Sequence, residues 1–481
     1  MYILKYKKNT LTKIVFFNKK KKDIGTSMAV VITYGTYDLF HKGHYRLLER
    51  AKELGDTLIV GVTSESYDHN RGKLNVRQSL MERIDNVKQS GLADKIIIEE
   101  YEGQKINDIL NNNVDIFTIG SDWEGKFNYL NEYCKVIYLD RTVGISSTKL
   151  RNENSFIKIG IVGNGRIAER FIVESKFVSG TTVESIYGRN LSRLKDFSNK
   201  HSIPECYTEY NDFLNSVNAV YIACPHQYHF EYSKQALMQG KHVLCEKPLA
   251  LSKLDANNLY KIAKSKNLVF LEAIKTAYCP AFVKMLALAK SGSIGHILAV
   301  DATFTKLENT KNRELTDEYF GGSVTELASY PLFAAIKLLG TNIKKANFNT
   351  YLKTNSNIDL FTHLTLQYES AIASLKIALG AKSEGSLVIT GTLGYIYVPA
   401  PWWKTEYFEL RYEDQTQNKK YFYKFNGDGL RYELAEFITL ISKQIYFSNK
   451  LTPNESIRII EVIEQFRNKT NLSELTIKQF E

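Results

Sequence analysis

The residues from Leu139 to Ala168, LDRTVGISSTKLRNENSFIKIGIVGNGRIA, decide how the chain is organised, because two phosphate-binding patterns meet there. In the first half, Arg141 at a strand end precedes a Ser-Ser-Thr helix start, which favours a phosphate group. In the second half, a buried strand leads into Gly163-x-Gly165-x-x-Ala168, the turn of a dinucleotide-binding site. Only the polar residues 152–155 separate the two halves. The sequence therefore predicts a fusion of two catalytic domains.

The bulk composition is that of a soluble globular protein. Of 481 residues, 44% are hydrophobic and 24% are charged, and the length allows two to four domains. The net charge of +11 permits nucleic-acid binding, but no RNP, zinc-finger or helix-turn-helix pattern is present. Anionic small substrates account equally well for the sign. We therefore expect small-molecule partners rather than nucleic acid.

Several features argue against secretion or membrane insertion. The five cysteines are widely spaced and form no CxxC pair, which disfavours a zinc site or a disulfide framework and fits a reducing cytoplasm. No apolar run approaches the ~20 residues that span a membrane. Residues 1–27 are basic with only a short apolar patch, and Met28 directly precedes the first strand. We expect residues 1–27 to be either a disordered tail or an artefact of the choice of start site.

Strands alternate with helices from residue 29 onward. Short runs rich in Val and Ile predict buried parallel strands at 29–34, 57–63, 95–99, 116–120 and 136–139. A helix with an apolar face follows the first strand, and residues 78–91 are amphipathic. This alternation predicts a doubly wound parallel sheet with a ligand crevice at the carboxyl ends of its strands.

A pair of histidines follows the first strand, in the segment GTYDLFHKGH from Gly35 to His44. His41 and His44 are three residues apart at a helix start, so their side chains share one face. The helix dipole and the amides of the first turn already favour an anion at this end. The alternative is two unrelated surface histidines, but the position between strand and helix favours a triphosphate site.

Five basic residues are placed by this pattern at the ligand crevice, where they could bind phosphate: Arg71, Lys73, Arg77, Arg83 and Arg141. For each residue taken alone, the alternative is a solvated surface charge, and for Arg71 and Lys73 the two interpretations are evenly balanced.

Residues 29–151 resemble the glycerol-3-phosphate cytidylyltransferase family, a branch of the HxGH nucleotidyltransferases. Four motifs in the right order carry the resemblance: GTYD at 35–38, HKGH at 41–44, GSDWEGKF at 120–127 and RTVGISST at 141–148. The resemblance implies that His41, His44, Lys73 and Arg141 are catalytic through their contacts with phosphate. It also implies a CTP site that contains Gly35, Thr36, Tyr37, Asp38, Asp122, Trp123, Ser146, Ser147 and Thr148.

The chemistry of such a transferase needs little covalent help from the protein. An oxygen of the acceptor phosphate attacks the α-phosphorus of CTP in line, and pyrophosphate leaves. Catalysis is then positioning plus stabilisation of negative charge by cations, amides and Mg²⁺ bound with CTP. No side chain is assigned as a metal ligand.

A second strand–turn–helix unit begins at 156. A strand at 156–162 leads into the Gly163 turn, and the next strand is expected at 183–187. That strand ends at Gly188-Arg189-Asn190, without the acidic residue that binds a ribose 2′-hydroxyl. Arg189 can instead hold a 2′-phosphate, which favours NADP over NAD. The alternative is that Arg189 stacks on adenine and tolerates both cofactors.

Residues from about 157 to the C-terminus resemble the Gfo/Idh/MocA oxidoreductase family, particularly its dihydrodiol-dehydrogenase-like branch. The matching segments are GNGRIA at 163–168, VLCEKP at 243–248, Glu272-Ala273 with Pro280, and 321–331 from Gly-Gly through Glu326 to Tyr330-Pro331. Further strands are expected at 219–224, 242–245, 298–305, 361–368 and 370–377. The resemblance implies an α/β architecture in which a Rossmann domain precedes an α/β domain with a mostly antiparallel sheet.

The same resemblance assigns roles to individual residues. It implies that NADP or NAD is bound by Gly163, Gly165, Arg166, Ile167, Arg189, Pro225, His226 and Glu246. It places Lys247 between nicotinamide and substrate, and Tyr330 at the position of a proton donor, with Glu326 as a further catalytic residue. For Lys247 the alternative is an exposed lysine, and for Tyr330 a packed aromatic is almost as well supported.

Two departures from the oxidoreductase pattern bear on activity. Glu326 stands where the family usually has Asp, and Ala277 replaces an Arg that is common in the nearest branch. Either departure indicates a changed substrate, or a weakened or lost activity.

The leading hypothesis is a bifunctional cytoplasmic enzyme in which the oxidoreductase makes a polyol phosphate and the cytidylyltransferase converts it to a CDP-polyol for surface-polymer synthesis. The first alternative keeps the transferase and makes the oxidoreductase a degenerate or regulatory module. The second is a nucleic-acid-binding protein. The expected domains are 28–152, 156–275 and 276–481, and a homo-oligomer is expected because both families commonly assemble through exposed faces.

Overall fold

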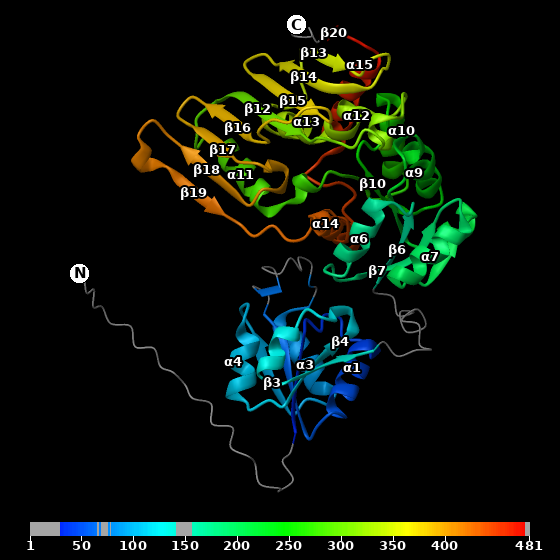
Figure 1. Cartoon of the computed structure of the whole chain (residues 1–481), viewed down its shortest axis with the longest axis vertical. Coiled ribbons are helices and arrows are strands. Elements are labelled where there is room, and N and C mark those ends of the chain that lie inside the picture. Colours follow the sequence, from blue (N-terminus) through cyan, green and yellow to red (C-terminus); the bar gives the residue numbers. More distant parts are fainter. Residues whose placement is uncertain (1–28, 65–66, 69–75, 77, 141–155, 477–481) are drawn as a thin grey trace, which may run out of the picture.

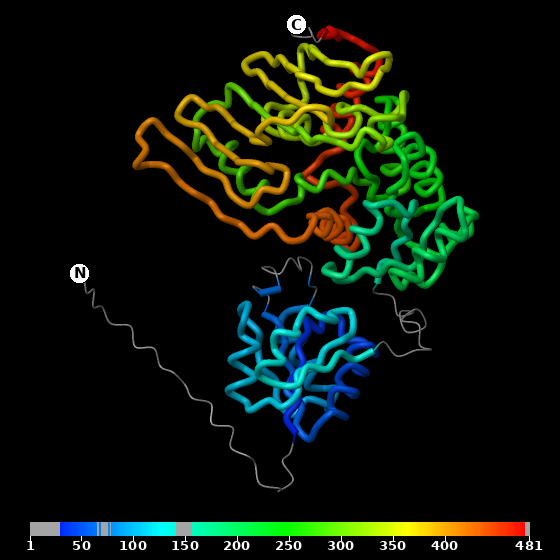
Figure 2. The backbone as a smooth tube through the Cα atoms, in the orientation of Figure 1, coloured from blue at the N-terminus to red at the C-terminus, as the bar shows by residue number. Residues whose placement is uncertain are grey.

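A computed structural model describes residues 29–64, 67–68, 76, 78–140 and 156–476 (Figures 1 and 2). In these ranges the strands form three sheets of five, six and nine strands. The predicted residues Arg71, Lys73, Arg77, Arg141, Ser146, Ser147 and Thr148 lie outside the described ranges.

The first sheet is parallel, with strand order β3-β2-β1-β4-β5. Its strands are β1 (Val30–Gly35), β2 (Thr57–Thr63), β3 (Lys95–Glu99), β4 (Ile116–Gly120) and β5 (Lys135–Leu139), and its helices are α1 (Lys42–Lys52), α3 (Leu80–Gln89) and α4 (Gln104–Asn111). Buried side chains run almost continuously along β1 and β2, because helices cover both faces of the sheet. The strand order reverses between β1 and β4, which places a crevice at the carboxyl end of β1.

The second sheet is also parallel, with strand order β11-β10-β9-β6-β7-β8. Its strands are β6 (Ile157–Val162), β7 (Thr181–Tyr187), β8 (Glu205–Tyr207), β9 (Ala219–Ile222), β10 (His242–Glu246) and β11 (Phe270–Ala273). Its helices are α6 (Arg166–Ser175), α7 (Leu191–His201), α8 (Tyr210–Asn215), α9 (His229–Met238) and α10 (Lys253–Ser265). The order reverses between β6 and β9, so the Gly163 turn opens at the point where such sheets bind ligands.

The third sheet is mixed, with strand order β19-β18-β17-β16-β12-β15-β14-β13-β20. Its strands are β12 (Ile297–Thr305), β13 (Lys345–Leu352), β14 (Asp359–Gln367), β15 (Ile372–Ala378), β16 (Leu387–Gly391), β17 (Tyr395–Val398), β18 (Tyr407–Arg411), β19 (Lys419–Phe422) and β20 (Leu472–Glu474). The β12–β15 and β13–β20 pairs are parallel, and the other pairs are antiparallel. The prediction of a mostly antiparallel sheet is confirmed.

Helices join the second and third sheets into one body: α11 (Pro280–Lys290), α12 (Ser323–Leu327), α13 (Ser329–Leu339), α14 (Leu430–Lys443) and α15 (Pro453–Arg467). One hydrophobic core runs from Ile161 on β6 to Leu375 on β15. The start of α14 is fixed to α6 by a buried bidentate ion pair, in which the Arg431 guanidinium donates to the Glu174 carboxylate over 2.9 and 2.7 Å.

Candidate active sites

The first site is built around a tight turn after β1. Tyr37 and Leu39 both have positive φ angles, 54° and 47°, which non-glycine residues adopt rarely. The Tyr37 ring is buried, and a Cβ atom on Gly35 would lie 2.9 Å from that ring. Asp38 accepts a hydrogen bond from the amide of Gln78 over 2.9 Å. The GTYD segment is therefore held in one strained shape at the crevice.

The two histidines lie together at the start of α1, as the sequence predicts. Their rings stack with centroids 3.9 Å apart, and Tyr37 meets His44 edge-on. His41 caps the helix, since its Nδ1 accepts from the amide of Gly43 over 3.0 Å. A Cβ atom on Gly43 would lie 2.8 Å from the His41 ring, which explains the glycine in HKGH. The two imidazoles therefore lie at the positive end of the α1 dipole, where an anion in the crevice would be stabilised.

Arg83 is not a crevice cation, contrary to the sequence-based expectation. Its side chain is fully buried, and Nη1 donates to the carbonyls of Thr36 and Thr63 and to the Asp68 carboxylate over 2.9, 2.9 and 3.1 Å. Asp68 also accepts from the hydroxyls of Thr36 and Thr63. Arg83 thus stabilises the turn at Thr36 from the interior of the protein.

Asp122 and Trp123 lie on a short 3₁₀ helix, η1 (Ser121–Trp123), directly after β4. This helix lies at the carboxyl end of the strand next to β1, on the same edge as the histidines. The ammonium of Lys126 lies 4.8 Å from the centre of the Trp123 ring. The described members of the predicted CTP site therefore follow the carboxyl ends of two adjacent strands, β1 and β4.

The second site begins at the Gly163 turn. Gly163 has a φ of 102°, and a Cβ atom there would lie 2.6 Å from the carbonyl oxygen of Ala223. Gly165 precedes α6 without a side-chain cap, which leaves the amides of the first turn for a phosphate. Arg166 is mostly exposed and pairs with Glu314 over 2.8 Å, while Ile167 packs against the core. This cradle fits a dinucleotide pyrophosphate.

Arg189 follows β7, where a 2′-phosphate or an adenine would lie. Its guanidinium carbon lies 5.4 Å from the centre of the Tyr228 ring, and Nη1 donates to the Tyr228 hydroxyl over 3.5 Å. Pro225 begins the short helix η3 (His226–Tyr228), which carries both His226 and Tyr228. These contacts hold Arg189 at the rim of the cofactor site and leave its two sequence-based interpretations open.

Lys247 and Glu326 meet where the cofactor and substrate parts join. The Lys247 ammonium donates to the backbone carbonyl of Glu326 over 2.9 Å. The Glu326 carboxylate accepts from Arg313 over 2.6 Å and lies 3.6 Å from Nε2 of His226. Burial raises the pKa of Glu326 and lowers that of His226 well below its usual value. A neutral imidazole and a paired carboxylate therefore face the lysine.

Tyr330 lies on α13 in an aromatic wall. Its ring centroid is 5.3 Å from that of Phe304, which stacks on Trp403 at 3.7 Å. Burial raises the pKa of Tyr330 well above its usual value, and the nearby Glu246 and Glu433 raise it further. Tyr330 is both a packed aromatic and a hydroxyl close to the predicted cofactor site, so the two sequence-based interpretations are compatible.

A buried acid pair lies behind this wall. Glu246 ends β10 and accepts a hydrogen bond from the Tyr221 hydroxyl over 2.5 Å. Glu433 on α14 is fully buried, and neither of its carboxyl oxygens has a hydrogen-bond partner among the described residues. Burial raises the pKa of both acids, most strongly that of Glu433, whose pKa the charge of Glu246 raises further. Two carboxyls in such a setting cannot both ionise readily, so the pair holds a proton.

Sequence reasoning missed Arg313, Glu433 and the Phe304–Trp403 wall. Arg313 lies on the short helix η5 (Arg313–Leu315) with nothing around it that marks a site. One feature of the sequence could have indicated Glu433. It is an acidic residue at a position of α14 where the neighbouring residues are apolar and buried. Trp402-Trp403 after Pro401 was a second signal, because adjacent tryptophans in a connecting segment are rarely solvated.

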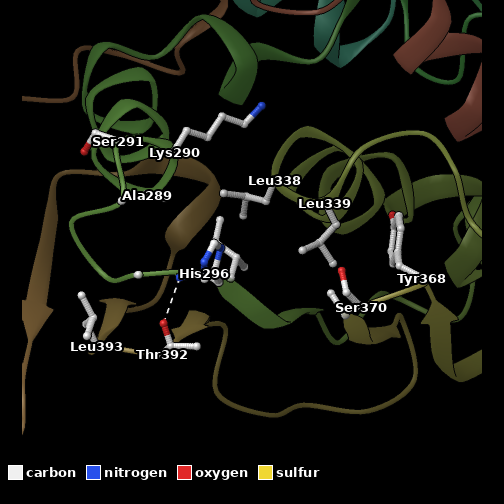
Figure 3. A pocket seen from close by; sticks show the side chains of 14 residues that line it. Ala289, Lys290, Ser291, His296, Leu338, Leu339, Tyr368, Ser370, Thr392 and Leu393 are labelled. Atoms are coloured by element: carbon white, nitrogen blue, oxygen red, sulfur yellow. Dashed lines mark hydrogen bonds between the residues drawn. The ribbon is translucent and has the colours of Figure 1, made fainter.

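A cavity of about 760 Å³ lies elsewhere, between the ends of α11 and α13 and the third sheet (Figure 3). Lys290, His296, Leu338, Tyr368 and Thr392 are among its lining residues, and the His296 amide donates to the Thr392 hydroxyl over 3.0 Å. None of the predicted site residues lines it.

Two further findings concern the described part of the chain. No helix there is both long and apolar enough to cross a membrane. No group of three or more His, Cys, Asp or Glu side chains within the described ranges is placed to hold a metal ion.

Family models match three consecutive segments. Residues 32–153 match the cytidylyltransferase-like family, residues 157–273 the NAD-binding Rossmann fold of the oxidoreductase family Gfo/Idh/MocA, and residues 282–397 the C-terminal domain of that family.

Known relatives match either the first part of the chain or the remainder of it, and thus show the same division. The glycerol-3-phosphate cytidylyltransferase of Bacillus spizizenii is 47% identical over 131 residues, which is 26% of this chain and 97% of that protein. The trans-1,2-dihydrobenzene-1,2-diol dehydrogenase of Bos taurus is 25% identical over 66% of this chain and 98% of its own length. A scyllo-inositol 2-dehydrogenase (NADP(+)) of Bacillus subtilis is 26% identical over the same shares.

Solved structures share the fold of the second part. The 3-ketoreductase KijD10 of Actinomadura kijaniata, in complex with NADP and TDP-benzene, superposes with a TM-score of 0.59 at 20% identity, over 67% of this chain and all of that chain. A levoglucosan dehydrogenase gives a TM-score of 0.58 at 16% identity, over 64% of this chain and 95% of its own. The chain is therefore a fusion of a cytidylyltransferase of the glycerol-3-phosphate cytidylyltransferase family with an NAD(P)-dependent oxidoreductase of the Gfo/Idh/MocA family.

Proposed function

We propose that the two enzymes act in sequence: the oxidoreductase reduces a keto- or aldo-phosphate to a polyol phosphate, and the transferase converts it to a CDP-polyol for a cell-surface polymer. The observation that carries the proposal is the pairing of the two families in one chain, because reduction of a sugar phosphate yields the alcohol-bearing phosphate monoester that such a transferase accepts. The division into domains 28–152, 156–275 and 276–481, with 1–27 as a tail, belongs to the same proposal.

In the transferase, His41, His44 and the start of α1 hold the phosphates of CTP against the GTYD turn. They stabilise the charge that develops as the acceptor phosphate attacks the α-phosphorus and pyrophosphate leaves. Asp122 and Trp123 seat the nucleotide and the acceptor on the opposite side of the crevice. Lys73, Arg141 and residues 146–148 complete the phosphate contacts, and Mg²⁺ arrives with CTP.

In the oxidoreductase, the Gly163 turn and the start of α6 cradle the pyrophosphate of the cofactor, and Arg189 favours NADP. The fit rests on two observations: a Cβ atom on Gly163 would meet the carbonyl oxygen of Ala223, so the tight turn requires glycine, and no side chain caps the start of α6. The bound nicotinamide supplies the hydride. Lys247 stabilises the oxygen that gains charge, and Tyr330 gives it a proton.

A second candidate is an active transferase with a catalytically degenerate oxidoreductase part. The observation that favours it is that both functional groups of Glu326 already have protein partners. Its carboxylate pairs with Arg313, and its backbone carbonyl accepts a hydrogen bond from Lys247. NADPH binding without turnover of any keto- or aldo-phosphate would support this candidate.

A one-pot reaction tests the sequential proposal. The full chain is incubated with NADPH, CTP and Mg²⁺ and, separately, with dihydroxyacetone phosphate, ribulose 5-phosphate and other short keto-phosphates. We expect one substrate to give a CDP-polyol whose formation requires NADPH. Reduction of unphosphorylated sugars only, or only after attachment of CDP, would contradict the proposed order.

We also propose a cytoplasmic homo-oligomer that binds no nucleic acid. The third sheet supports the assembly, because Ile372 and Tyr395 are exposed large apolar side chains next to buried residues of their strands, and Phe422 is exposed at the end of the edge strand β19. Exposed apolar side chains of this kind favour a protein–protein interface. Light scattering of the full chain would measure the assembly.

A further inference from the structure

We propose that Lys275 and Lys404 form a binding subsite for a phosphate group on the substrate of the oxidoreductase. This inference rests on the proposed function and narrows it, because it names the substrate class that the second site selects. Neither lysine belongs to a motif of the sequence analysis.

Lys247 and Lys275 follow adjacent parallel strands of the second sheet. β10 and β11 are adjacent parallel strands, and Glu246 is in register with Ala273. Lys247 directly follows Glu246, and Lys275 comes two residues after Ala273, at the start of the short helix η4 (Lys275–Tyr278). Both lysines therefore leave the carboxyl ends of neighbouring strands, the edge where such sheets bind ligands.

Lys404 is held close to Lys275 by a link between two short helices. The Thr276 hydroxyl on η4 donates to the carbonyl of Trp403 over 2.8 Å, and Trp403 and Lys404 both belong to η6 (Trp402–Lys404). The Trp403 ring stacks on Phe304, which contacts Tyr330. Lys404 therefore directly follows a residue of the aromatic wall formed by Trp403, Phe304 and Tyr330, the predicted proton donor.

The charges around the lysines do not balance. The Lys275 ammonium donates to the backbone carbonyl of Asp428 over 2.7 Å, and Lys404 pairs with the Asp428 carboxylate over 3.1 Å. Arg170 lies 3.7 Å from the other oxygen of the same carboxylate. One carboxylate therefore faces three cations. Each ammonium carries three donors, and among the described residues each makes one hydrogen bond, while Lys404 also lies 5.8 Å from the centre of the Phe425 ring.

The nearby acid pair supplies less negative charge than two free carboxylates would. Glu246 and Glu433 lie close enough to act on Lys275, but burial raises the pKa of each. Burial also lowers the pKa of Lys275, and the positive charge of Lys404 lowers it further. A phosphate dianion would relieve this repulsion. Lys404 is about one-third exposed (33%), so an anion can reach the pair.

The test compares matched substrates in the full chain. NADPH oxidation is measured with a short ketose phosphate, the unphosphorylated ketose and a carboxylate analogue of the same length. In Lys275→Met and Lys404→Met, the ratio of kcat/KM for the phosphate ester to that for the neutral ketose should fall by about 10- to 100-fold, as expected for a lost hydrogen bond to a charged group. Lys404→Arg should restore part of the ratio, and Lys345→Met, which removes an exposed lysine at the start of β13, should leave it unchanged.

A second measurement does not depend on turnover. Isothermal titration of inorganic phosphate into the NADP-loaded chain, with CTP present to occupy the transferase site, should give binding that is lost in Lys275→Met and Lys404→Met and kept in Lys345→Met. Unchanged phosphate binding in both variants, an unchanged substrate ratio, or a preference for the carboxylate analogue would overturn the subsite. If the wild-type chain binds phosphate in this lysine-dependent way but turns over no ketose phosphate, the proposed function fails and the subsite stands.

Discussion

Replacing Arg83 with methionine should unfold the transferase part of the chain and leave the oxidoreductase part folded. Arg83 is fully buried between α3 and the first sheet. It supplies the cation opposite Asp68, and it donates to the carbonyls that end two neighbouring segments, Thr36 after β1 and Thr63 at the end of β2. Methionine fills much of the volume but carries no donor.

The size of the effect follows from these contacts. Removing one partner of a buried ion pair costs about 3–5 kcal/mol, because the remaining charge stays buried. Two carbonyls also lose a donor that carried a charge, at about 1.5–3 kcal/mol each, although the hydroxyls of Thr36 and Thr63 still donate to Asp68. Contributions within one network do not add fully. We therefore expect a loss of about 4–6 kcal/mol, comparable to the whole stability of a small domain.

The tryptophans offer an assay that separates the two parts. The chain has three, of which Trp123 lies in the transferase part and Trp402 and Trp403 lie beside the third sheet. In protein labelled with 5-fluorotryptophan, urea titration followed by fluorine NMR reports each part separately. In Arg83→Met the Trp123 resonance should show its unfolded position at much lower urea, while the other two keep their midpoints.

A matched control removes a neighbouring charge. Lys88→Met changes an exposed cation on the same helix, and the midpoint of Trp123 should stay within error. The reasoning is refuted if Arg83→Met leaves that midpoint where it was, or if all three resonances shift together. The first result would mean that Arg83 is not an internal brace, and the second that the two parts unfold as one unit.

Three further predictions concern chemistry and pH. His44→Ala should lower cytidylyl transfer by about 10²- to 10³-fold, measured as pyrophosphate release, with NADPH oxidation unchanged; equal damage to both activities would contradict separate sites. Lys247→Met should suppress hydride transfer while the dissociation constant for NADPH, read from fluorescence, stays near the wild-type value; undiminished turnover would remove Lys247 from the mechanism. Burial raises the pKa of Glu272 to about 7, so the neutral form stabilises the fold at low pH and this stability is lost as the pH rises through about 7. The free energy of unfolding that urea titrations of the third-sheet tryptophans report should therefore fall by up to about 3 kcal/mol between about pH 5 and 8. Glu272→Gln should remove most of that slope, and an equal slope in the variant would rule Glu272 out as its source.

Local pattern was enough to predict most of the fold. The strand predicted at 156–162 is observed at Ile157–Val162, followed by the predicted Gly163 turn and helix. The pattern was readable because a buried parallel strand is apolar along its whole length and a phosphate turn needs glycine at a positive φ. The histidines of HKGH were equally local, since helix geometry alone brings His41 and His44 together. Strand ends differed by one or two residues, as at β7, which begins at Thr181 rather than at 183.

Properties that depend on distant segments were not predictable. In sequence, Arg83 is one more cation in a basic region, and only the fold shows that Asp68 and two carbonyls surround it. The acid pair requires the end of β10 to meet α14, although 186 residues separate Glu246 from Glu433. Lys275 and Lys404 are likewise brought together by contacts of Thr276 and Asp428 that join distant segments. Side-chain chemistry that long-range packing assembles leaves no periodic trace in the chain.

The acid pair sets the protonation state of the proposed proton donor. Burial and the two nearby carboxyls keep the Tyr330 hydroxyl protonated across the neutral range, because a phenolate there would be both poorly solvated and repelled. The phenolate that proton donation leaves behind meets the same penalty, so these surroundings favour neither reduction nor oxidation. The residue that stabilises charge on the reacting oxygen in the proposed mechanism is therefore Lys247, and Tyr330 contributes a hydrogen-bond donor that stays protonated.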